Sequence, residues 1–350
     1  MRKLSGRSWL SIITVVFLVL VIATAHKEIM HAWHLMSRVN IWILLLLLPV
    51  QFVSYYAAGE MIFSYLRQQQ EIPRLSGMYM TRLALEMNFV NHVLPSGGVS
   101  GVSYMGWRLK QFGIPVSKST TGQLVRMVAA FGSFMTLLAI SVVMMAYDGN
   151  LNRWIAGISF VLVLFLFAAL AGVVYLLNHE TRYTQLCRKI VWLVNRVAKI
   201  VTFGARSRVI TSTPMLTFFN EIERDYRQIM RNKHVLLKPY LWGLVFCITE
   251  VAMFWITFWA LGDSVNPAPL VIAYGLAGVA GFFMVTPGGA GLYEAIMVSF
   301  LAAAGIAPQL SIAGIVLTRV ILMLGTILTG YVFYQQAITR HGTRSSTDER

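Results

Sequence analysis

This chain has few of the residues on which soluble enzymes and secreted proteins depend. Only 12% of its 350 residues are charged and 57% are hydrophobic, whereas soluble domains are about 25% charged. Its two cysteines, Cys187 and Cys247, are too few for a disulfide framework, and we interpret both as packing residues. Long apolar runs take the place of the missing charges, so the sequence predicts an integral membrane protein.

Catalytic and nucleotide-binding motifs are missing as well. The sequence has no Gly-x-Ser-x-Gly, no Walker loop and no His-Glu-x-x-His. No cysteine or carboxylate cluster completes a metal site around His26, His31 and His34. We therefore expect neither catalysis nor ATP hydrolysis by this chain, and no metal or other cofactor.

Acidic residues are scarce relative to basic ones. The chain has 29 lysines and arginines against 14 aspartates and glutamates, which gives a net charge of +15. No recognised nucleic-acid-binding motif accompanies this charge. We attribute it to loops held in the cytoplasm by the positive-inside rule and attracted to anionic headgroups, so the expected partners are membrane lipids and not nucleic acid.

Six stretches are long and apolar enough to cross a bilayer, which takes about 20 residues. Two further apolar stretches, 78–107 and 268–304, are each interrupted, and we predict that each enters the membrane and returns on the same side. The predicted fold class is therefore an all-α polytopic membrane protein. The six spans are predicted at residues 9–25, 41–66, 119–147, 154–178, 238–261 and 311–336.

The distribution of basic residues predicts the orientation of these spans. Residues 179–238 contain twelve lysines and arginines, whereas residues 148–153 contain one and residues 262–270 none. Basic loops stay in the cytoplasm, so both termini are expected there, in a cell membrane protein. The two interrupted stretches then enter from opposite sides, as in inverted repeats. Residues 1–25 are interpreted as an uncleaved first span, with a cleaved signal peptide as the alternative.

Both interrupted stretches break at a proline that is followed by glycines. Proline removes a backbone N–H and glycine loosens the backbone, so a helix cannot continue there. Lipid tolerates open backbone only where protein or a water-filled cavity satisfies it, and matched broken segments indicate a transporter's binding site. The residues assigned to this site are Pro95, Gly97 and Gly98 in the first half, and Pro287, Gly288, Gly289 and Gly291 in the second.

Each break is preceded by a glutamate and followed by an arginine, both inside predicted spans. The glutamates lie 35 and 37 residues before the proline, and the arginines 31 and 32 residues after it. They are Glu60 and Arg126 in the first half, and Glu250 and Arg319 in the second. Charges at bilayer depth are costly unless paired or hydrated, so we predict that these residues bind substrate. For Glu60 and Arg126 the alternative is that they extend to the membrane interface.

Three polar residues beside the breaks complete the predicted substrate-binding set: Asn91, His92 and Glu294. The pKa range of histidine makes His92 a candidate proton carrier, although a hydrogen-bonded structural histidine is the alternative. A helix that restarts after the glycines presents free N–H groups that favour an anion. Arg319 can bind phosphate in bidentate fashion, and Glu250 or Glu294 can hold it when no ligand is bound.

The only sizeable polar region contains two amphipathic stretches, at 186–201 and 216–229. They are expected to form either a helical pair packed under the membrane domain or a lipid-binding arm. We predict one membrane domain over residues 1–337, with 179–237 as its cytoplasmic basic helices. Residues 338–350 are predicted to be a disordered tail.

Two motifs in this sequence are similar to motifs of one known family. They are Asn91-His92-Val93-Leu94-Pro95 and the run from Val285 to Glu294, which resembles a Pro-Gly-Gly-x-Gly-x-x-Glu element. The chain resembles the lysylphosphatidylglycerol synthase transmembrane region, a flippase-like domain, over about residues 10–337. The best understood members of that family move aminoacylated phosphatidylglycerol between leaflets, and some carry a separate cytosolic lysyltransferase domain.

The resemblance implies the translocation part alone, because no such transferase domain is expected in these 350 residues. Many relatives have a charged residue just after the first proline, where this chain has Ser96 and Gly97. That difference leaves open which anionic or aminoacylated phospholipid, or lipid-linked amphiphile, is the substrate.

The main hypothesis is therefore a lipid translocase. A second hypothesis is a non-catalytic subunit that docks a separate synthase or glycosyltransferase through residues 179–238. A third is a membrane-embedded transferase with Glu250 or Glu294 as base. A homo-oligomer is compatible with each of them.

Overall fold

The computed structural model describes residue 30, residues 39–70, 77–94, 99–149 and 153–177, nine positions within 182–196, and residues 212–282 and 291–341. The regular structure in these residues is helical, and no β-strand occurs among them. The predicted all-α fold class is therefore confirmed.

Five helical segments within the described residues are long and apolar enough to cross a membrane. They are α3 with α4 (Ile41–Leu44 and Leu47–Gln68), α7 (Val116–Tyr147), α8 (Arg153–Leu177), α11 (Leu237–Ala260) and α14 (Pro308–His341). Each lies within a few residues of a predicted span, and the protein is a multi-pass membrane protein. The first predicted span, 9–25, lies outside the described residues. The helix α14 continues beyond residue 337, so the predicted boundary of the tail falls inside a helix.

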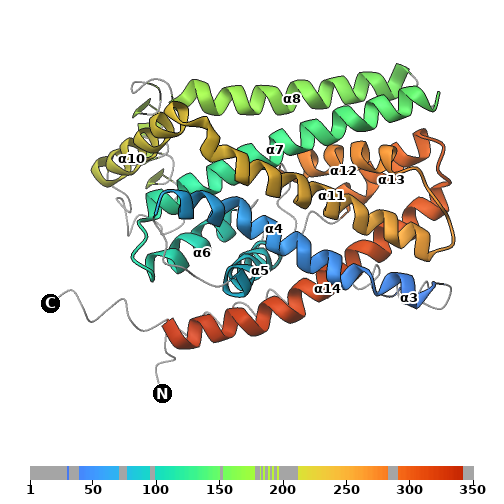
Figure 1. The fold of residues 1–350 in the computed structure, drawn as a ribbon, viewed down its shortest axis with the longest axis horizontal. Helices are drawn as coiled ribbons and strands as arrows, with labels where there is room; N and C mark the ends of the chain where they lie inside the picture. The colour runs from blue at the N-terminus through green and yellow to red at the C-terminus, as the bar shows by residue number, and fades with distance from the viewer. Residues whose placement is uncertain are drawn as a thin grey trace.

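The two interrupted stretches form pairs of shorter helices. The first pair is α5 (Gly77–Val93) and α6 (Val99–Lys110), and the second is α12 (Pro267–Phe282) and α13 (Leu292–Ala303). The breaks themselves, at 95–98 and 283–290, lie outside the described residues. In Figure 1 the first pair occupies one half of the molecule and the second pair the opposite half. Each pair follows one spanning helix and leads back to the next. Because α4 and α11 run in opposite directions, the two pairs enter the helix bundle from opposite ends.

Helices α4 to α7 correspond to helices α11 to α14 in reversed orientation. Within each half, the first spanning helix contacts the hairpin, and the second helix of the hairpin contacts the next spanning helix. The contacts between halves match too, because α5 packs against α14 and α12 packs against α7. These contacts are thus preserved when the halves are exchanged, as expected for an inverted repeat whose halves are interlocked. The contact of α11 with α7 is an exception, because the corresponding contact of α4 with α14 is minor.

In both of these contacts between the halves, a phenylalanine packs directly against a glycine. A Cβ added at Gly275 of α12 would collide with Phe134 of α7, and one added at Gly330 of α14 would collide with Phe89 of α5. In one contact the glycine belongs to the hairpin, and in the other it belongs to the spanning helix. Small residues let membrane helices approach closely, which favours association through van der Waals contact.

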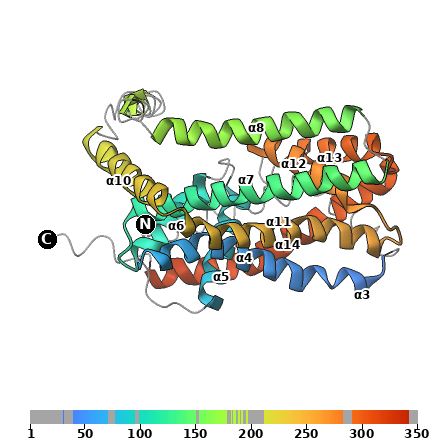
Figure 2. The same cartoon turned by 45° about the horizontal axis from the view of Figure 1, so that its top comes forward.

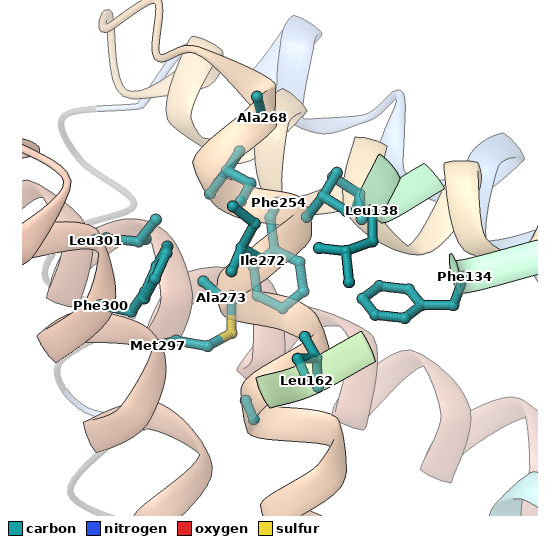
Figure 3. Packing of buried hydrophobic residues seen from close by; sticks show 14 of the residues in the cluster. Phe134, Leu138, Leu162, Phe254, Ala268, Ile272, Ala273, Met297, Phe300 and Leu301 are labelled. Carbon is teal, nitrogen blue, oxygen red and sulfur yellow. The ribbon is translucent and has the colours of Figure 1, made fainter. Parts of the chain in front are cut away.

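The largest buried cluster surrounds α12. Figure 3 shows Phe134, Leu162 and Phe254, from α7, α8 and α11, gathered around Ile272 of α12. Side chains from four helices therefore fix the second hairpin against the spanning helices, and with it the residues that this hairpin presents to the interior.

The second amphipathic stretch forms α10 (Ser212–Arg231), which packs against α7. Asp225 is buried and accepts hydrogen bonds from Lys118 Nζ at 2.6 Å and from Thr121 Oγ1 at 3.0 Å. These contacts favour the interpretation of α10 as a helix packed under the membrane domain. The first amphipathic stretch, 186–201, lies mostly outside the described residues.

Candidate functional site

A cavity of about 420 Å³ lies where the two halves meet. Helices α5, α7, α8, α11, α12, α13 and α14 all contribute to its lining. Most lining residues are apolar or aromatic, and a few polar side chains converge among them, as in many ligand sites. The polar and ionisable side chains are His92, Glu250, Tyr274, Tyr293, Glu294 and Arg319.

Arg319 of α14 is held beside the second break by Glu294 of α13. Its Nη1 donates to Glu294 Oε1, and its guanidinium carbon lies 4.4 Å from the centre of the Tyr293 ring. Glu294 Oε2 accepts a hydrogen bond of 2.6 Å from the backbone N–H of Gly291. Of the two glutamates considered as partners of Arg319, Glu294 is the one that contacts it.

Gly291 supplies the turn that places Glu294 there. Its φ of 94° lies in the left-handed region, which glycine adopts without steric cost. Glu294 then lies in the first turn of α13, where the positive end of the helix dipole favours a carboxylate. The last glycine of the predicted motif is therefore required by the backbone geometry.

Glu250 of α11 lines the same cavity. Its Oε1 accepts a hydrogen bond of 2.7 Å from Ser54 Oγ of α4, and its carboxyl group also interacts with the Tyr274 hydroxyl of α12. Arg126 of α7 lies within electrostatic reach of it. Across the described helices, no arginine or lysine forms a salt bridge with Glu250. The cavity therefore contains a carboxyl group whose direct partners are hydroxyl groups.

His92 of α5 brings a titratable group from the first half. Its Nδ1 lies 2.9 Å from the Asn88 carbonyl oxygen, which can only accept, so Nδ1 carries the hydrogen. Arg319 lies within electrostatic reach of the ring. The geometry leaves Nε2 as the ring nitrogen that can exchange a proton or accept a hydrogen bond from a ligand.

Three predicted residues lie outside this lining. Glu60 is paired with Arg67 two turns further along α4, and Asn91 Oδ1 accepts a hydrogen bond of 2.8 Å from Gly101 N of α6. Arg126 of α7 is not among the lining residues, and its Nη1 lies 3.8 Å from Met87 Sδ. The structure therefore brings together His92, Glu250, Glu294 and Arg319. Glu60 is instead paired within α4, and Asn91 joins α5 to α6. Pro95, Gly97, Gly98, Pro287, Gly288 and Gly289 lie outside the described residues.

The sequence prediction missed both tyrosines in the lining. Tyr293 stands directly before Glu294 in the second motif, so its position in the motif was the available signal. Tyr274 lies in an apolar stretch, and only the packing of α12 against α7 and α11 brings it to Glu250.

A second buried charged cluster, also missed, joins α5 to α6. Glu86 accepts hydrogen bonds of 2.9 Å from Arg82 Nε, Tyr104 Oη and Arg108 Nε. Glu86 is fully buried, and the Arg108 side chain is 1% exposed. This cluster does not line the central cavity, and it fixes the two arms of the first hairpin.

A family comparison places this site in context. The family model described as the lysylphosphatidylglycerol synthase TM region matches residues 8–330. The chain belongs to this family.

The lysylphosphatidylglycerol synthase TM region thus covers both hairpins and every cavity-lining residue. One curated relative is a UPF0104 membrane protein from Methanothermobacter thermautotrophicus, 23% identical over 188 residues. The alignment covers 54% of this chain and 53% of the relative, so the chain spans about half the length of the curated relative that it matches. No solved structure matches the chain.

Proposed function

We propose that this protein is a lipid translocase whose central cavity accepts the headgroup of an anionic or aminoacylated phospholipid, or of a lipid-linked amphiphile. The observation that carries the proposal is the placement of Arg319 and Glu250 in one cavity between two inverted hairpins. Ionisable groups inside a membrane domain commonly mark a substrate pathway. Membership of the lysylphosphatidylglycerol synthase TM region supports a role in handling membrane lipids.

The charges suit the two ends of such a headgroup. Arg319 presents a planar guanidinium that matches the oxygens of a phosphate, and an incoming phosphate competes with Glu294 for it. Glu250 has no cationic partner in direct contact among the described residues, so it is available to an ammonium group or to a proton. The proposal requires no covalent step.

The inverted repeat supplies a means of exposing the cavity to each side in turn. In transporters with inverted repeats, one repeat moves against the other around a site near the middle of the membrane. Here residues of both repeats line the cavity, with His92 from the first and Glu250, Glu294 and Arg319 from the second. Movement of either hairpin therefore changes access to the same side chains.

The test is leaflet exchange of fluorescent phospholipids in liposomes that contain the purified protein. We expect Arg319→Ala and Glu250→Gln to slow exchange at least tenfold. Arg227→Ala and Glu223→Gln, which alter an ion pair on the surface of α10, serve as matched controls and should exchange at the wild-type rate. A folded wild-type protein that exchanges no headgroup would contradict the proposal. Co-purification of a soluble synthase, lost on removal of α10, would then favour the subunit hypothesis.

A further inference from the structure

The helix α8 forms one edge of the bundle. It packs against α7 and α12, and Figure 2 shows these two helices between α8 and the layer of α4, α11 and α14. Its outer face is apolar, because Phe160, Leu164 and Phe167 are 68%, 55% and 61% exposed. This edge therefore presents an exposed, apolar helix face.

Two apolar grooves border α8, one toward each of its ends. The first has a volume of about 690 Å³ and is lined by Arg153, Trp154, Gly157, Ile158 and Val161 of α8 with Leu276 of α12. The second has a volume of about 420 Å³. Its lining includes Val128 and Gly132 of α7, Leu170 of α8, Tyr240 of α11, and Lys233 and His234 of the 3₁₀ helix η1 (Lys233–Leu236).

The lining of each groove includes an exposed basic residue. Arg153 is exposed at the start of α8, and Lys233 is exposed at the start of η1. Among the described residues neither of them forms a salt bridge. Arg153 and Leu170 are seventeen residues apart, or about 26 Å along the helix, close to the ~30 Å thickness of the hydrocarbon core. The two grooves therefore lie toward the two ends of this membrane-spanning helix.

An apolar groove with an exposed cation in its lining matches the two parts of a phospholipid. The groove suits an acyl chain, and exposed basic side chains near the membrane surface attract anionic headgroups. An apolar segment of a protein partner would fill the groove but leave the basic residue without a counter-charge. Charge complementarity thus favours a bilayer phospholipid as the occupant.

The middle of α8 borders the central cavity. Leu166 lines that cavity and lies between Val161 of the first groove and Leu170 of the second. We propose that the two grooves bind bilayer phospholipids, one from each leaflet, and that α8 is the lateral wall past which a lipid enters and leaves the cavity. The proposed lipid binding is argued from the grooves alone, whereas the proposed passage of lipid into the cavity rests on the proposed function as a translocase.

Two glycines allow each groove to be filled separately, and a third provides a control. A Cβ added at Gly157 or Gly172 would meet no atom within 4 Å, and one at Gly132 would meet only carbons of the Tyr240 ring, at 3.8 Å. Gly157→Leu therefore fills the first groove and Gly132→Leu the second, each with little displacement of neighbours. Gly172→Leu adds the same side chain to α8 outside both linings and is the matched control.

The experiment uses the full-length protein in liposomes that contain phosphatidylglycerol with a photoreactive acyl chain. We expect adducts on peptides that carry Ile158 and Val128, in the wild type and in Gly172→Leu. Each filling variant should lose adducts in its own groove at least fivefold and keep those in the other. Arg153→Gln and Lys233→Gln should weaken labelling of the first and second groove, respectively. Even labelling along α8, unchanged in all variants, would overturn the binding proposal.

Leaflet exchange by the same variants separates this inference from the proposed function. Slower exchange in Gly157→Leu and Gly132→Leu, but not in Gly172→Leu, supports passage along α8. Loss of adducts with undiminished exchange would overturn the passage and leave the translocase proposal in place. Specific adducts from a wild-type protein that exchanges no lipid would support the grooves and overturn translocation.

Discussion

At the scale of single residues, buried charges perform two different tasks in this protein. The side chains of Arg319 and Glu294 are 21% and 18% exposed and face the cavity, so a ligand can reach them. The side chains of Arg108 and Glu86 are 1% and 0% exposed, which excludes any ligand. Their accessibility therefore fits the proposed binding role of the first pair and a structural role of the second.

The structural task can be tested with Glu86→Gln. The change removes the negative charge that neutralises Arg108, and leaving one member of a buried pair uncompensated costs about 3–5 kcal/mol. We expect a clear fall in the thermal unfolding midpoint of the purified protein in detergent. Glu223→Gln, whose partner Arg227 is largely exposed, should change stability by about 0–1 kcal/mol. Equal midpoints for the two variants would show that the Glu86 cluster is not structural.

The binding task can be tested with Arg319→Lys. Lysine keeps the positive charge but loses the planar guanidinium and its contact with the Tyr293 ring. We expect lipid exchange to slow about tenfold, while Arg67→Lys on α4, outside the cavity, exchanges normally. Normal exchange by Arg319→Lys would show that a point charge is sufficient at this position.

Four residues of the cavity were predictable because of where they occur in the sequence. A charge within an apolar span must be paired or face a polar cavity, which identified Glu250 and Arg319, and proximity to a break identified His92 and Glu294. Which buried charges pair with each other was not predictable from the sequence. The contact between Arg108 and Glu86, for example, depends on how α5 and α6 cross.

At the scale of helices, the positions of the membrane spans could be predicted from composition, whereas the contacts between spans could not. Hydropathy predicted the ends of α7, α8, α11 and α14 to within a few residues, because apolar length is set by the bilayer. It carries no information on which spans touch. The close approach of α11 to α7 depends on Gly243, where an added Cβ would lie 3.0 Å from the Ala129 carbonyl oxygen.

Gly243→Ala should therefore destabilise the protein. The new methyl group meets backbone on α7, which cannot yield as a flexible side chain would, and overpacking of this kind costs about 1–3 kcal/mol. Gly172→Ala, which enters open space on α8, should be neutral or slightly stabilising, because alanine favours a helix. Thermal unfolding of both variants in the same detergent measures the difference. A Gly243→Ala protein as stable as Gly172→Ala would mean that α7 and α11 separate easily.

At the scale of the whole molecule, the repeat predicted from two sequence motifs has become an arrangement of eight helices. The motifs suggested that the halves are inverted, and the matching contacts within α4 to α7 and within α11 to α14 agree with that. The interlocking of the halves had no signal in the sequence, because it depends on contacts such as that of Phe89 with Gly330.

Cysteine labelling tests the inverted arrangement in a membrane. With Cys187 and Cys247 replaced, single cysteines at Lys110, after the first hairpin, and at Ser264, before the second, are both exposed positions. We expect a membrane-impermeant maleimide to reach them from opposite sides, with Lys110 on the cytoplasmic side. Labelling of both from one side would contradict the arrangement.

The contact between α5 and α14 has a consequence for synthesis of the protein. Ribosomes add about 5–20 residues per second, so Phe89 waits on the order of tens of seconds before Gly330 has been made. During that interval the first hairpin is inserted without its final neighbour. Because Glu86 and Arg108 belong to the same hairpin, their ion pair can form during this interval. The buried charges of nascent α5 and α6 can therefore neutralise each other before α14 leaves the ribosome.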